Sequence, residues 1–166
     1  GGAQTTFGGS YDGFVSKLNG ELTSLTRSTY FGGSGVEFIN ALAVSGANVY
    51  VAGRTLSDPF PGTTGGAQED YGGGTFYGDG FVSKLDEGLT VLSRSTYLGG
   101  SGEDTIYSLV VSGGYVYVAG RTLSDPFPGT AGGAQEDFGG GSYDGFVSKL
   151  NEGLTVLSRS TYLGGS

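Results

Sequence analysis

Residues 79–101 read DGFVSKLDEGLTVLSRSTYLGGS, and residues 144–166 repeat this stretch with one change, Asn151 in place of Asp86. The opening triplet DGF occurs a third time at 12–14. These positions give a period of about 66 residues, and self-similarity at a fixed period is the signature of repeat architectures. One repeat cannot bury its apolar face alone, so successive repeats must pack against one another. The sequence therefore predicts two and a half copies of one packing unit.

Each full unit contains four segments with the patterning of β-strands, separated by Gly, Asn and Asp. In the last copy they are 105–112 (TIYSLVVS), 115–122 (YVYVAGRT), 145–150 (GFVSKL) and 154–163 (LTVLSRSTYL). No window shows a helical period flanked by caps. We therefore expect an all-β chain with four antiparallel strands per unit, which is the composition of a β-propeller blade.

Short turns are expected between these segments. The dipeptide Gly-Gly at 113–114 is a two-residue hairpin signal, and Ala-Asn at 47–48 takes its place in the earlier copy. Asn-Glu-Gly at 151–153 is expected to join the last two strands of the unit. A longer, Pro- and Gly-rich connection occupies 58–79 and 125–144.

The long connection is expected to be a surface loop without strands. Proline lacks a backbone donor, so the DPFP sequence cannot lie in a central strand. The aromatic residues between the prolines, Phe60 and Phe127, are predicted to anchor the loop onto the sheet.

The composition limits the kinds of site that the chain can carry. It has 166 residues and neither Cys nor His, which removes disulfides, thiolate ligands and the usual general base near neutral pH. The formal net charge of −8 argues against nucleic acid and anionic membrane surfaces as partners. No apolar stretch approaches the ~18 residues of a membrane span. The chain also lacks Met and a visible signal peptide, and we expect it to be a piece of a longer protein.

The motifs STYLGGSGED, VYVAGRT, DPFPGTAGGAQ and DGFVSKL together resemble the bacterial seven-bladed β-propeller repeat (SBBP) family over essentially the whole chain. The resemblance implies a secreted or cell-surface protein of many blades, without a well-established catalytic activity. The chain departs from the family in copy number. A weaker similarity to NHL-type blades sets the phase, with an outer half-blade at 1–34 and full blades at 35–101 and 102–166.

Repeated tyrosines are the first candidate ligand site. Aromatic rings with polar neighbours suit carbohydrate, and the candidates are Tyr50, Tyr97, Tyr117 and Tyr162. The alternative, which the repetition favours, is packing between blades with the hydroxyl group at the rim.

Repeated carboxylates are the second candidate. Oxygen ligands beside Gly-rich turns suit Ca²⁺, and the candidates are Glu69, Asp70, Asp79, Glu136, Asp137 and Asp144. The first copy has Thr5-Thr6 in place of Glu-Asp, and turn carboxylates that cap backbone N–H groups are the favoured alternative. No cofactor is otherwise expected.

Arginine recurs in the AGRT motif, four residues before an aspartate. The pairs Arg54–Asp58 and Arg121–Asp125 are expected to form repeated ion pairs at the base of the loop. Without His, the abundant Ser and Thr residues do not predict a nucleophilic site, so no enzyme activity and no catalytic residue is expected.

The sequence thus favours a non-catalytic, self-assembling propeller module, located outside the cell or on its surface. A carbohydrate-binding propeller is the alternative. Two and a half blades cannot close a ring, since propellers have at least about four. The expected partners are other copies of the chain or further blades, which would add strands beside 13–18 and 22–31; glycans are a further candidate partner.

Overall fold

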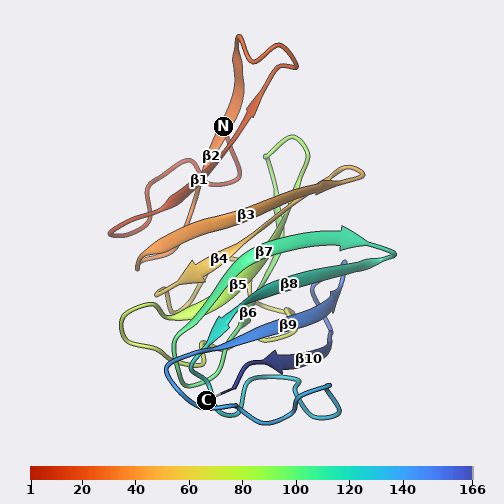
Figure 1. Ribbon diagram of the computed structural model, residues 1–166. Helices are drawn as coiled ribbons and strands as arrows, with labels where there is room; N and C mark the ends of the chain where they lie inside the picture. The colour runs from red at the N-terminus through yellow and green to blue at the C-terminus, as the bar shows by residue number, and fades with distance from the viewer. Residues whose placement is uncertain (166) are drawn as a thin grey trace.

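The computed structural model describes residues 1–165, which form three antiparallel β-sheets and no helix. The sheets follow one another from the N-terminus to the C-terminus in the order of the sequence (Figure 1). The first sheet contains β1 (Gly13–Leu18) and β2 (Leu25–Phe31). The second contains β3 (Glu37–Ser45), β4 (Asn48–Thr55), β5 (Asp79–Asp86) and β6 (Leu92–Leu98). The third contains β7 (Asp104–Ser112), β8 (Tyr115–Thr122), β9 (Asp144–Asn151) and β10 (Leu157–Leu163).

Within each sheet, every strand pairs with the next strand along the chain. The expected all-β chain, with four antiparallel strands in each full repeat, is therefore confirmed. The alternation of side chains explains why these segments are strands. In β8, Val116 and Val118 are buried on one face, whereas Tyr115 and Tyr117 lie on the other face and are half-buried.

The turn between β3 and β4 differs by one residue from the prediction. Ser45 pairs with Asn48, so the two turn residues are Gly46-Ala47 and not Ala47-Asn48. Gly46 has φ 56°, a backbone conformation that glycine adopts without steric cost. The equivalent turn at 113–114 is the predicted Gly-Gly pair.

The last strand of the repeat starts three residues later than predicted, at Leu157. Asn151 Oδ1 accepts hydrogen bonds from the backbone N–H groups of Thr155 and Val156, at 2.8 and 3.0 Å, and these bonds hold 152–156 as a turn. Leu154 adopts φ 56° in this turn, and its side chain is fully buried. The turn therefore contributes to the core as well as to the connection.

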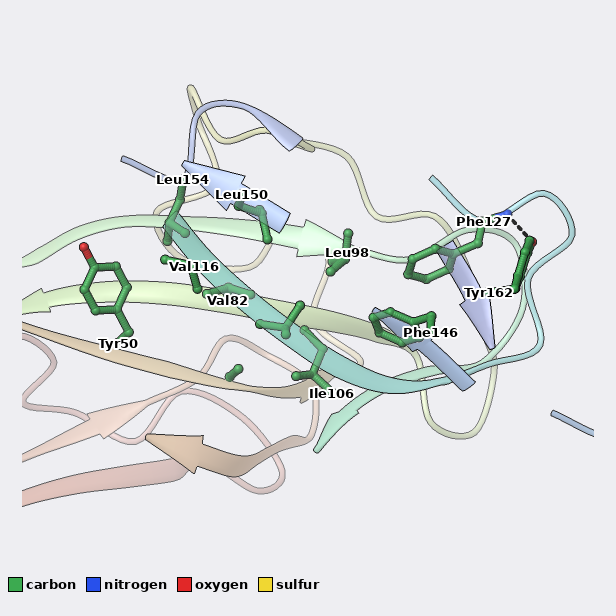
Figure 2. Packing of buried hydrophobic residues seen from close by; sticks show 12 residues of the cluster. Tyr50, Val82, Leu98, Ile106, Val116, Phe127, Phe146, Leu150, Leu154 and Tyr162 are labelled. Carbon is green, nitrogen blue, oxygen red and sulfur yellow. Dashed lines mark hydrogen bonds between the residues drawn. The ribbon is translucent and has the colours of Figure 1, made fainter. Parts of the chain in front are cut away.

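Apolar side chains pack between consecutive sheets (Figure 2). Tyr50, Val82 and Leu98 of the second sheet pack against residues of the third sheet, among them Ile106 and Val116. In the other cluster, Val15 and Phe31 of the first sheet pack on the opposite face of the second sheet. The second sheet is therefore covered on both faces.

The long connections, 56–78 and 123–143, contain no strand. Phe60 and Phe127 are 2% and 1% exposed, so their predicted role as anchors is confirmed. Both loops begin with a cis Asp-Pro bond. None of residues 1–165 lies in a helix long and apolar enough to cross a membrane.

Candidate functional site

Two of the candidate sugar-binding tyrosines are enclosed in the protein. Tyr162 is 0% exposed; its hydroxyl group donates to the carbonyl of Ser124 (2.8 Å) and accepts the backbone N–H of Phe127 (2.7 Å). Tyr97 makes the equivalent pair of bonds in the second repeat and is 1% exposed. These hydroxyl groups tie the start of the long loop to the last strand of the sheet.

The other two tyrosines occupy equivalent positions on β4 and β8. Tyr50 is fully buried between the second and third sheets, and its hydroxyl group donates to the carbonyl of Glu152 (3.1 Å). Its counterpart Tyr117 is half-buried on the free face of the third sheet. Of the four, Tyr117 alone keeps solvent access, so the structure does not gather these tyrosines into one accessible surface.

The aspartate of each DGF triplet caps the Gly-rich segment before it, as the turn interpretation predicts. Asp79 accepts the backbone N–H groups of Gly72 (2.7 Å) and Gly73 (3.2 Å). Asp12 accepts the N–H of Gly8 at 2.8 Å, and Asp144 accepts an equivalent bond from Gly139. The capping role is confirmed by these bonds in all three copies.

The remaining carboxylates of the proposed calcium site differ from the capping aspartates in their exposure to solvent. Glu69, Asp70, Glu136 and Asp137 are exposed, whereas Asp79 and Asp144 are buried. Within residues 1–165, no group of three or more Asp or Glu side chains is placed to hold a metal ion. One oxygen of Glu69 accepts the N–H of Gly65, which is a local turn bond.

A pair of carboxylates meets at the junction between the second and third sheets. A Cβ atom on Gly99 would lie 2.6 Å from Asp104 Oδ2 and 2.9 Å from Asp79 Oδ1, so only glycine fits between the two side chains. The equivalent position between the first and second sheets is Gly32, which lies against Asp12 and Glu37. The junctions are therefore built from the same chemical parts.

Both carboxyl groups of this pair have raised pKa values. Burial raises the pKa of Asp79 to about 8, and the neighbouring charge of Asp104 acts in the same direction. Burial raises the pKa of Asp104 to about 6, against hydrogen bonds from Ser124 and Gly100 that favour the charged form. Among residues 1–165, Oδ1 of Asp104 is buried without a hydrogen-bond partner. Protonation of one of the two carboxyl groups would relieve the repulsion between two buried charges.

Glu103 binds the loop of the preceding repeat. Its carboxylate accepts the consecutive backbone N–H groups of residues 75–78; the bonds from Thr75, Phe76 and Gly78 are 2.9 Å long. Burial alone would raise the pKa of Glu103, but these four bonds lower it below the usual value. Four converging N–H groups form a strong anion-binding cradle. This contact fixes the position of Tyr77 at the edge of the second and third sheets.

The two AGRT arginines stack on aromatic rings. Among residues 1–165 they do not form the predicted ion pairs with Asp58 and Asp125. The guanidinium carbon of Arg54 lies 4.2 Å from the ring centre of Phe38 and 4.7 Å from that of Tyr77. That of Arg121 lies 4.1 Å from the ring centre of Tyr143. The rings of Tyr77 and Tyr107 are 5.3 and 5.8 Å from Arg121. We call this set the arginine–aromatic rim: Phe38, Arg54, Tyr77, Tyr107, Arg121 and Tyr143.

The rim is accessible to solvent. Phe38, Tyr77 and Tyr107 are 45%, 39% and 50% exposed, and the two arginines are half-buried. Sequence reasoning missed this site, because Tyr77 lies in the long loop and meets Arg121 of the following repeat only when the sheets stack. The repeated arginine was a visible signal. So was the tyrosine near the end of each long loop, Tyr77 and Tyr143.

No family model matches the chain. The chain is similar to the regulatory protein FlaEY of Caulobacter vibrioides, with 32% identity over 127 residues. The match covers 74% of this chain but only 12% of the length of that relative.

Proposed function

We propose that the chain is a non-catalytic structural segment of a β-propeller, in which each sheet is one blade and the segment assembles with further blades. The observation that supports this proposal is the repetition of one junction. Equivalent positions of the repeat form the contact between the first and second sheets and the contact between the second and third sheets. Both junctions have an apolar face and a pair of carboxylates around one glycine. A repeated junction of this kind can be extended by any further repeat that offers the same surface.

The free face of the third sheet supports the proposal. Leu163 is 58% exposed and Val147 is half-buried, whereas their counterparts in the second sheet, Leu98 and Val82, are 1% and 0% exposed beneath the third sheet. At the start of β9, Oδ1 of Asp144 is buried without a hydrogen-bond partner among residues 1–165. This face therefore has the side chains of a junction, and a further repeat beginning with Glu or Asp on its first strand would complete it.

The first sheet supports it from the other end. Its residues Phe14, Leu18, Leu22 and Leu25 are 70%, 44%, 74% and 63% exposed. The equivalent side chains of the full repeats are buried or half-buried beside their own inner strands. β1 is equivalent to β5 of the second sheet, and it pairs with β2 along one edge. Its other edge is equivalent to the edge of β5 that pairs with β4. An inner strand pair from a partner would add here by β-augmentation.

The proposal is tested by sedimentation of residues 1–166 over a dilution series into the micromolar range. We expect reversible association, because two apolar faces are exposed. Val147→Asp and Leu163→Asp are expected to weaken it, since each places a charge in the free face. Val156→Asp is the matched control, because Val156 is 52% exposed but lies in the turn between β9 and β10. A monodisperse, stable monomer throughout the series would refute the proposal.

A further inference from the structure

The arginine–aromatic rim contains an arginine, Arg121, that forms no ion pair with an acidic side chain among residues 1–165. Nε of Arg121 is buried without a hydrogen-bond partner within the described residues, and the rings of Tyr77, Tyr107 and Tyr143 surround the guanidinium group. The nearby carboxylate of Glu103 is already occupied by four backbone N–H groups. Ring faces compensate positive charge but accept no N–H bond along the edge of the guanidinium plane.

Two arginines outside the rim, Arg94 and Arg159, differ from Arg121 because they donate hydrogen bonds to backbone carbonyls. Arg94 donates to the carbonyl of Thr64 (2.9 Å), and Arg159 donates to the carbonyl of Ala131 (3.3 Å). Both are therefore anchored to the backbone of their own repeat. Arg54 also donates to a backbone carbonyl, that of Tyr77, at 3.3 Å. Arg121, by contrast, makes no side-chain hydrogen bond within residues 1–165.

Because Nε of Arg121 is buried, a ligand would reach the guanidinium group through its two Nη groups. This planar end of the group suits a carboxylate or sulfate, which it binds through two parallel hydrogen bonds. Stacking on Tyr143 restricts the rotation of the Arg121 side chain before a ligand binds, so less conformational entropy is lost on binding. The rings of Tyr107 and Phe38 are about half exposed and offer apolar faces, and Tyr107 also carries a hydroxyl group at one edge. Such faces suit the C–H side of a sugar ring, while the hydroxyl group of tyrosine can bond to sugar oxygens.

We propose that the rim binds an acidic saccharide, with the anionic group on Arg121 and a sugar ring against Tyr107. The site consists of different residues from the tyrosines that the sequence suggested, and it is complete within the second and third sheets. It does not depend on a propeller arrangement. The net charge of −8 would repel a long anionic polymer, but this repulsion is screened beyond about 8 Å at physiological ionic strength. A short oligosaccharide is therefore the expected ligand.

Titration calorimetry of the whole chain tests the proposal with three probes: a short oligogalacturonate, a sulfated dextran oligosaccharide and a neutral maltooligosaccharide. We expect at least one acidic probe to bind and the neutral probe not to bind, and the comparison identifies carboxylate or sulfate as the preferred group. Arg121→Gln is expected to lower the affinity by about tenfold or more, because a charge-assisted hydrogen bond is lost. Arg121→Lys keeps the charge without the planar fork and should lose part of the affinity. Tyr107→Ala should also weaken binding.

Arg159→Gln is the matched control, since it makes the same change in net charge at an exposed arginine away from the rim. It should leave the affinity unchanged, and circular dichroism of every variant checks that the sheets remain folded. Equal binding of the neutral probe, or binding that Arg121→Gln leaves intact, would overturn the proposal. Acetate binding as tightly as oligogalacturonate would also overturn it, because the sugar ring would then contribute nothing.

Discussion

Removal of the Tyr162 hydroxyl group should destabilise the third sheet strongly. Figure 2 shows this group bonded to the backbone N–H of Phe127, and it also donates to the carbonyl of Ser124. Tyr162→Phe keeps the ring but leaves a buried donor and a buried acceptor without partners. Each such group costs about 1–3 kcal/mol, so the free energy of unfolding should fall by about 2–6 kcal/mol. In a chain of this length, each kcal/mol corresponds to about 2–4 °C in Tm.

The repeat provides a matched control for this measurement. Tyr30 is the equivalent residue of the first sheet, and it is 43% exposed. Tyr30→Phe removes the same atom from a group in contact with water, so its effect should be within a few tenths of a kcal/mol. Urea unfolding followed by circular dichroism gives both values, at protein concentrations that are held equal. Equal stability of the two variants would refute the reasoning, because the backbone bonds of Tyr162 would then contribute nothing.

Three further predictions concern the carboxylates. Burial gives Asp79 and Asp104 pKa values in the folded state that lie above those of the unfolded chain. Their contribution to stability is therefore present below about pH 4 and is lost as the pH rises through about 6 to 8. Urea unfolding across this range should show the decline in the free energy of unfolding, and Asp104→Asn should make that decline smaller. A pH-independent stability would contradict the buried pair. Glu103→Gln should speed hydrogen exchange at the amides of residues 75–78, since it removes the charge that these N–H groups bind; unchanged protection would argue against the cradle. A chelator should leave Tm unchanged, because the capping oxygens of Asp79 already accept backbone bonds; a lower Tm in the chelator would restore the calcium hypothesis.

Much of the strand and turn structure could be predicted from local patterns. β8 has the predicted bounds, because alternation of Val with Tyr and the flanking Gly residues are encoded within a few positions. The anchoring by Phe60 and Phe127 was also predictable, because proline excludes the loop from the sheet and leaves the aromatic side chain to be buried. The turn 46–47 differs from the prediction by one residue and the start of β10 by three, and both differences lie at element ends. Side-chain bonds from Asn151 decided the second of these boundaries.

The sequence by itself determined the repeat, the all-β class, the order of strands in each sheet and the capping aspartates, since all of these depend on neighbours along the chain. Only the tertiary structure decided that Tyr50 is buried while its counterpart Tyr117 is not, because burial depends on whether another sheet covers the face. It also decided the partners of Arg54 and Arg121. In the sequence each lies four residues from an aspartate, but stacking of the sheets places Tyr77 between them. Contacts made between repeats depend on the angle and spacing of whole sheets, which no local pattern encodes.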